Sequence, residues 1–282
     1  MADVTEIAPR VWVAHYPWMQ VNITVVGSDR GLLVVDTYGS ERAAAEVLTD
    51  VRRLGAGPVV AVVNTHEHWD HTFGNAALLD AYAGTPIHAT TWAAEHTIEA
   101  GERIKRVYGG SDDEHADEVL RTRIRSADHT FVTEQRIDLG DREVRLCHPG
   151  RGHTGGDLIV HIPDADVLAA GDLVEEADHP WFGIDCYPLD WPASLDRVRR
   201  LLTSATVVVP GHGAPVDRDF VQEQRSDVGV VAETIRDLAT RGVPLAEALA
   251  AADWPFPREG LAEAVRLGYE HLPRSQKRLP LV

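Results

Sequence analysis

The stretch Val59-Val60-Ala61-Val62-Val63-Asn64-Thr65-His66-Glu67-His68-Trp69-Asp70-His71 decides how the rest of the chain is interpreted. Its first five residues are apolar and mostly β-branched, which predicts a buried strand. Its last six contain four metal-ligand side chains, His66, His68, Asp70 and His71. Along an extended chain the first three would point to one side, so His71 joins them only if the chain turns there. Imidazole together with carboxylate suits zinc, iron or manganese better than calcium or magnesium.

Length, charge and the chain termini narrow the class of protein. The chain has 282 residues, of which 44% are hydrophobic and 25% charged, and a formal net charge of −17. Nucleic acids and anionic membranes are bound by basic surfaces, so this charge argues against both as partners. The N-terminus lacks the basic and apolar segments of a signal peptide, and no apolar run reaches membrane-spanning length. These features predict a cytoplasmic protein.

Alternating and apolar patterns predict a mixed α/β chain. Early strands are expected at 10–16, 22–26 and 31–36, and a helix at 41–54 with Ser40 as its N-cap. Residues 92–125 are mostly helical in pattern with a break at 109–113, which indicates an insertion beside the site. From about residue 218 the pattern is helical to the end. We therefore expect a catalytic domain over 1–217 and a helical extension over 218–282 packed on it.

Three predicted strands later in the chain each lead into a loop with a ligand-type residue. These residues are His153, Asp172 and His212, and each follows a glycine, which lets the backbone turn sharply and approach closely. Strand ends of one sheet converge in space even when they are far apart in sequence. Seven ligand-type residues on four strand ends fit a site for two metal ions with one shared carboxylate.

These motifs together resemble the metallo-β-lactamase superfamily over roughly residues 10–215. The resemblance rests on the HxHxDH pattern of 66–71, Gly152-His153-Thr154, Gly171-Asp172 and Pro210-Gly211-His212. It implies an αββα four-layer sandwich, with two β-sheets inside and helices outside.

The resemblance also implies how the ligands divide between two Zn²⁺ ions. One ion would be held by His66, His68 and His153, and the other by Asp70, His71 and His212, with Asp172 bridging. An aspartate at 172 resembles the glyoxalase II-type and general hydrolase branches more than the zinc β-lactamases that use a cysteine ligand.

Such a site predicts a binuclear metal-dependent hydrolase. A metal-bound hydroxide would attack an ester, thioester, lactone or lactam carbonyl, and Asp70 would be the catalytic residue that orients it and takes its proton. Iron or manganese is the alternative to zinc. Two other functions stay open: an oxidoreductase resembling the persulfide dioxygenases, with one iron on His66, His153 and Asp172, and a non-catalytic metal-binding protein.

Side chains in and beside the motifs offer candidates for supporting roles. Asp36, Thr65 and Thr154 are candidates to orient the imidazoles, with plain capping or turn roles as the alternative. Loops that flank the site carry four candidates for substrate contact, for which loop packing is the alternative role: His15, Tyr16, Trp18 and Trp181. Aromatic side chains near a metal predict a small, partly apolar substrate. For the helices after 218 three roles stay open: covering the site, supplying substrate contacts or forming a homodimer interface.

Overall fold

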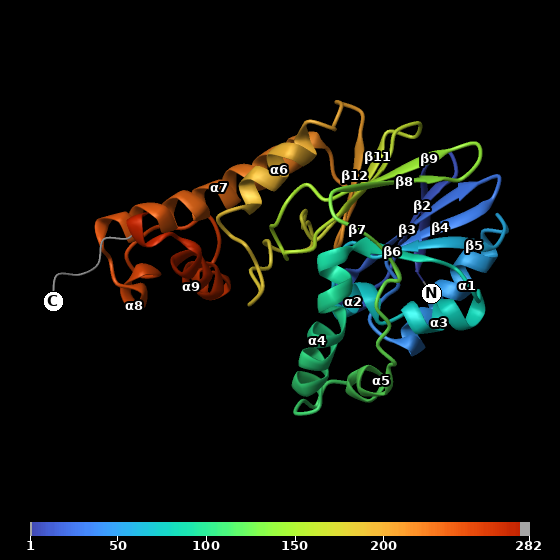
Figure 1. Cartoon of the computed structure of the whole chain (residues 1–282), viewed down its shortest axis with the longest axis horizontal. Coiled ribbons are helices and arrows are strands. Elements are labelled where there is room, and N and C mark those ends of the chain that lie inside the picture. The colour runs from blue at the N-terminus through green and yellow to red at the C-terminus, as the bar shows by residue number, and fades with distance from the viewer. Residues whose placement is uncertain (1, 277–282) are drawn as a thin grey trace.

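Figure 1 shows the computed structural model of the chain, which describes residues 2–276. Two β-sheets lie face to face, and helices cover their outer faces. The first sheet has the order β1-β2-β3-β4-β5-β6-β7 and the second β12-β11-β10-β9-β8. The predicted αββα four-layer sandwich is confirmed.

Most of the strands follow apolar or alternating runs of the sequence. The first sheet contains β1 (Asp3–Ala8), β2 (Val11–His15), β3 (Asn22–Ser28), β4 (Gly31–Val35), β5 (Val59–Val63), β6 (Ile87–Thr90) and β7 (His129–Phe131). The second contains β8 (Glu134–Asp138), β9 (Glu143–Cys147), β10 (Ile159–Ile162), β11 (Val167–Gly171) and β12 (Val207–Pro210). The sequence does not predict strand β1, because this edge strand has no buried residue and carries no apolar run.

Three hydrophobic clusters hold the four layers together. The central cluster joins the inner faces of the two sheets, with residues such as Val35 and Val63 facing Val160 and Ala169. A second cluster packs the first sheet against α1 (Glu41–Arg53) and α3 (Asn75–Ala81). The helix α1 begins where expected, because the Ser40 hydroxyl accepts a hydrogen bond from the Ala43 amide at 2.9 Å.

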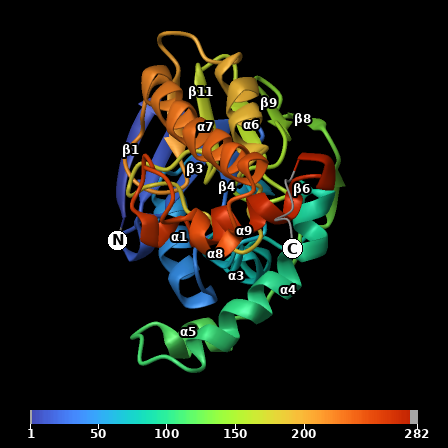
Figure 2. The same ribbon diagram turned by 90° about the vertical axis from the view of Figure 1, so that its left-hand side faces the viewer.

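The third cluster packs the second sheet against the C-terminal helices. These are α6 (Trp191–Arg199), α7 (Arg218–Arg241), α8 (Leu245–Ala248) and α9 (Ala262–His271). Figure 2 shows α7, α8 and α9 lying together on one side of the sheets. Residues on both sides of position 217 belong to this cluster, among them Leu173 and Leu195 before it and Ile235 and Val265 after it.

The predicted insertion forms a long helix and a short one. These are α4 (Thr91–Tyr108) and α5 (Ala116–Arg121), separated at the expected break. In Figure 1 both extend from the first sheet past α2 (Trp69–Thr72). Among the described residues, no helix is both long enough and apolar enough to cross a bilayer.

The ends of the parallel strands define where the site lies. Strands β4 to β7 run parallel in the first sheet, and β11 pairs parallel with β12 in the second. The sheets meet at this edge, where the Asn22 amide donates to the Gly211 carbonyl at 2.8 Å. A Cβ on Gly211 would overlap Asp172 Oδ1, so this close approach requires glycine. The loops after β5, β11 and β12 therefore converge.

Candidate metal centre

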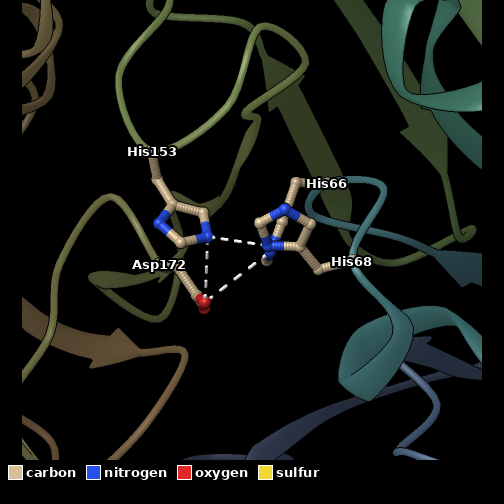
Figure 3. A group of neighbouring side chains, drawn as sticks. All are labelled: His66, His68, His153 and Asp172. Atoms are coloured by element: carbon tan, nitrogen blue, oxygen red, sulfur yellow. Dashed lines mark hydrogen bonds and ion pairs between the residues drawn. The ribbon is translucent and has the colours of Figure 1, made fainter. Parts of the chain in front are cut away.

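The structure brings all seven predicted ligands together at the convergent strand ends. The first group consists of His66, His68 and His153 with Asp172, and Figure 3 shows these four side chains pointing toward one another. The second group consists of Asp70, His71 and His212. Within each group, one ligand atom from every residue lies within 4.8 Å of the others.

The local backbone explains how one short motif serves both groups. His68 is extended, with φ −69° and ψ 152°, and helix α2 begins at the next residue, Trp69. The chain therefore turns earlier than the sequence indicated. Asp70 and His71 lie on this helical turn and leave the line of His66 and His68.

In the first group, the outer nitrogen of every imidazole has a hydrogen-bond acceptor. His153 Nδ1 donates to the Trp181 carbonyl at 3.1 Å, and His68 Nε2 lies 3.4 Å from Asp185 Oδ2. His66 Nδ1 lies 3.0 Å from Thr65 Oγ1, whose own proton is donated to Asp36 at 2.8 Å. Each of these acceptors places the imidazole proton on the outer nitrogen. When such an imidazole is neutral, its inner nitrogen therefore carries the lone pair.

The second group follows the same rule. His71 Nδ1 donates to Asp36 Oδ2 at 2.9 Å, and His212 Nδ1 donates to the Met19 carbonyl at 2.6 Å. Their Nε2 atoms face each other at 3.3 Å. In the first group, His153 Nε2 faces His68 Nδ1 at 2.9 Å.

In the neutral imidazoles, facing lone pairs repel unless a cation lies between them. A proton or a metal ion can fill this place, and the donor set fits metal ions. His66 Nε2 supplies a further observation, because it is fully buried and has no hydrogen-bond partner within residues 2–276. A buried polar atom without a partner is costly, and a metal ion would satisfy it. Histidine and aspartate together are donors typical of zinc, iron and manganese sites.

Asp172 lies between the two groups. Its Oδ2 atom is 3.4 Å from His153 Nε2 and 3.3 Å from His212 Nε2. Its Oδ1 atom is 3.1 Å from His71 Nε2. One carboxylate thus reaches imidazoles of both groups, which is the arrangement that a bridging ligand needs.

Burial and opposite charges set the protonation of the cluster. Burial lowers the pKa of His66 well below its usual range and that of His153 to about 4. Burial also opposes charge on His71, but the carboxylates of Asp172 and Asp70 raise its pKa well above the usual value. Against the effect of burial, His71 and His212 lower the pKa of Asp70 to about 2. Against burial, His71 and His212 likewise hold the pKa of Asp172 well below its usual range, so Asp70 and Asp172 are ionised at neutral pH and attract cations.

Comparison with known proteins agrees with this geometry. The family described as the metallo-beta-lactamase superfamily matches residues 16–212, more than half of the chain. The chain belongs to the metallo-β-lactamase superfamily. It is an enzyme, a hydrolase of the metallo-β-lactamase fold.

Individual relatives are distant but cover most of the chain. A type 2 metallo-β-lactamase from Bacillus cereus is 28% identical over 227 residues, covering 78% of this chain and 79% of that protein. The solved metallo-β-lactamase from Pontibacter korlensis has a TM-score of 0.65 at 24% identity and covers 81% of this chain and 99% of its own. FIM-1 from Pseudomonas aeruginosa, solved in a mono-zinc form, has a TM-score of 0.65 at 20% identity and covers 82% of this chain and 96% of its own. These two structures share the fold.

Three residues were expected to orient the imidazoles of this superfamily member. Two of the three contact an imidazole. Asp36 Oδ2 accepts from His71, and Thr65 Oγ1 lies against His66. Thr154 has a different role. Its hydroxyl lies 2.8 Å from Asp157 Oδ1 and 3.1 Å from Glu67 Oε2, so it stabilises the loop that carries His153.

The four candidates for substrate contact are placed very differently. Tyr16 is fully buried and its hydroxyl donates to Asp50 at 3.3 Å, which leaves it no surface for a substrate. Trp18 is half-buried and stacks on His115, with ring centroids 3.9 Å apart. His15 Nδ1 lies 3.0 Å from Asn22 Oδ1. The Trp181 side chain is 62% exposed, directly beside its carbonyl contact with His153.

Sequence reasoning missed two acidic residues of the site. Glu175 clusters with Asp172 and His212, and burial together with Asp172 raises its pKa well above its usual value. The only signal in the sequence was its place in the loop after Asp172. Asp185, which contacts His68, lies further along the same connection and belongs to no ligand motif.

Proposed function

We propose that the protein is a binuclear zinc hydrolase that cleaves a lactam, lactone, ester or thioester bond. The observation that carries the proposal is that imidazole nitrogens face one another within each of the two ligand groups, and that Asp172 reaches histidines of both groups. The first group would hold one ion, the second group the other, and Asp172 would contact both. When bound, zinc lowers the pKa of water toward about 7 and polarises a carbonyl oxygen.

Within this proposal, Asp70 is the catalytic residue of the chain itself. Its Oδ2 atom lies 3.3 Å from His212 Nε2 and 3.5 Å from His71 Nε2, at the edge of the second group. Because Asp70 is ionised at neutral pH, it can accept a hydrogen bond from the attacking water and hold it in place. No serine or cysteine nucleophile is required.

The proposed substrate is small and partly apolar. Trp181 supports this, because its main-chain carbonyl orients His153 while its indole ring is exposed to solvent. Trp18 supports it from the opposite loop, since Met19, the next residue, orients His212. The relatives from Bacillus are named metallo-β-lactamases, so a β-lactam belongs among the first compounds to test.

Metal analysis combined with a substrate panel tests the proposal. We expect about two zinc ions per chain and turnover of at least one chromogenic lactam, lactone, ester or thioester. About one iron per chain, with oxygen consumed in the presence of a persulfide, would favour the dioxygenase alternative instead. Full zinc loading without turnover of any of the four bond classes would favour a binding protein and overturn the proposal.

A further inference from the structure

One short loop supplies the hydrogen-bond acceptors for two of the three histidines in the first group. It runs from Trp181 to Tyr187, and we call it the 181–187 loop. The Trp181 carbonyl accepts from His153 Nδ1, and Asp185 Oδ2 lies 3.4 Å from His68 Nε2. The same loop also binds the His153 loop directly, because the Tyr187 amide donates to the Gly152 carbonyl at 2.8 Å.

Asp185 is fixed from its other side by the insertion. Arg103 of α4 donates from Nη2 to Asp185 Oδ2, the same oxygen that faces His68. The two side chains are partly buried, with 34% of Arg103 and 25% of Asp185 exposed. Hydrogen bonds between a guanidinium and a carboxylate are strong, and they strengthen when water is excluded. A chain of polar contacts therefore runs from α4 to the first group, through Arg103, Asp185 and His68.

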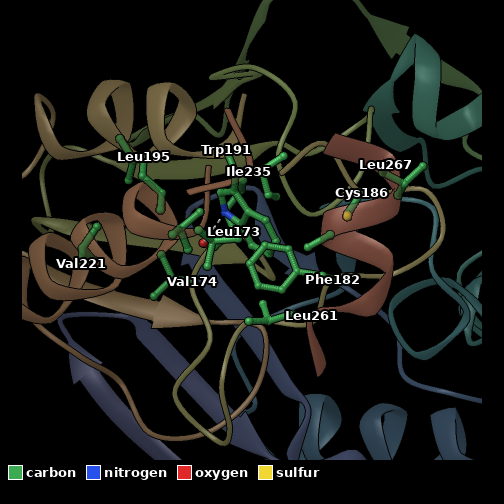
Figure 4. Packing of buried hydrophobic residues seen from close by; sticks show 14 of the residues in the cluster. Leu173, Val174, Phe182, Cys186, Trp191, Leu195, Val221, Ile235, Leu261 and Leu267 are labelled. Carbon is green, nitrogen blue, oxygen red and sulfur yellow. Dashed lines mark hydrogen bonds between the residues drawn. The ribbon is translucent and has the colours of Figure 1, made fainter. Parts of the chain in front are cut away.

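The C-terminal helices fix the loop itself. Phe182 and Cys186 are buried in the cluster that includes Leu261 and Leu267 of the C-terminal region, as Figure 4 shows. Trp181 and Ile184 lie on the opposite, exposed side of the loop. This alternation anchors the backbone on either side of Asp185.

We propose that Asp185, held by Arg103, is a positioning residue for the first group. The proposal rests on the proposed function in one respect, namely that His68 binds a metal ion. The Asp185 carboxylate keeps the proton of His68 on Nε2 and turns Nδ1 toward His66 and His153. The insertion and the C-terminal helices thereby act on the metal site without contacting it.

Replacing Asp185 by Asn tests this inference with minimal change in shape. Loss of the carboxylate should lower the zinc affinity of one ion by about 10- to 100-fold and leave the second ion in place. Arg103→Met should shift affinity in the same direction, because Asp185 is then free to turn toward solvent. Arg106→Met, an exposed position on the same helix, is the matched control and should change nothing.

The affinities are measured by competition with a chromophoric chelator, and the visible spectrum of the cobalt-substituted protein reports on the ligand geometry. Excess zinc should restore kcat in Asp185→Asn, which loss of folding would not allow. Wild-type affinity and an unchanged cobalt spectrum in Asp185→Asn would overturn the inference. That outcome is distinct from failure of the proposed function, in which the wild-type protein binds zinc but turns over none of the substrates.

Discussion

Replacing Asp36 by Asn should selectively weaken the second metal site. The Asp36 carboxylate is buried and accepts three hydrogen bonds: from the Thr65 amide at 2.8 Å, the Thr65 hydroxyl at 2.8 Å and His71 Nδ1 at 2.9 Å. The asparagine side chain has one oxygen and one NH₂ group. Both oxygens of Asp36 accept from donors, so in the variant the NH₂ group must face one of these donors. If the NH₂ group faces His71, the imidazole proton moves to Nε2 and removes the lone pair that would bind metal. If it faces the Thr65 amide, two donors meet at 2.8 Å.

The size of the effect follows from these contacts. Loss of a carboxylate that orients a metal-binding histidine lowers metal affinity by about 10- to 100-fold, which corresponds to about 1.4 to 2.7 kcal/mol. Asp36 has φ +65°, a left-handed conformation that asparagine tolerates better than most residues. The substitution therefore tests the hydrogen bonds with little added backbone strain.

The assay is a zinc titration in competition with a chelator, with metal content measured by atomic emission. We expect one ion to bind with wild-type affinity and the other about 10- to 100-fold more weakly. Asp50→Asn is the matched control, because Asp50 is equally buried but contacts Tyr16 and not the ligand groups. If Asp36→Asn binds both ions as tightly as the control, the reasoning about tautomers is refuted.

Three further predictions separate metal binding, protonation and packing. Asp70→Ala should abolish hydrolysis and reduce zinc content by about one ion per chain; turnover near the wild-type rate would contradict the mechanism. Burial lowers the pKa of His68, but Asp185 outweighs this effect and raises that pKa to about 9. The protonated form of His68 therefore stabilises the metal-free protein fully below about pH 6.5, and this contribution is lost as the pH rises to about 9. Zinc must displace that proton, so affinity for one ion should rise up to about tenfold per unit between pH 7 and 9 and then level off; pH-independent titrations would refute this. Tyr16→Phe should cost about 1 kcal/mol of unfolding free energy in denaturant titrations and leave KM unchanged, whereas a changed KM at equal stability would restore its substrate role.

The ligands could be predicted from sequence because their signals are local. His66 and His68 share a side of an extended chain after a run of β-branched residues, and each later ligand follows a glycine. The helices α1 and α7 were predictable for a similar reason, since Ser40 and Asp217 cap their first turns. In these cases the residues that determine the structure are neighbours in the chain.

The supporting residues could not be predicted because their roles depend on tertiary packing. Asp185 gains its role only when Arg103, 82 positions earlier, folds against it. Tyr16 illustrates the opposite error. An aromatic residue in a loop between two strands has no local signal that says whether it faces a substrate or the core, and here Asp50 of α1 draws its hydroxyl inward.

Two of the five imidazoles are oriented by main-chain carbonyls, those of Met19 and Trp181. Every residue has a carbonyl, so no sequence pattern marks these two, and no side-chain substitution removes them. Their position depends on loop conformation, and Met19 itself adopts a left-handed φ of +60°. Both residues lie in loops proposed to flank the substrate. It follows that replacing the Trp181 side chain can alter substrate contact alone, whereas changing the length of either loop must alter the metal site as well. In this fold, new specificity is therefore obtained at least cost to the metals by changing side chains on a loop backbone of constant length.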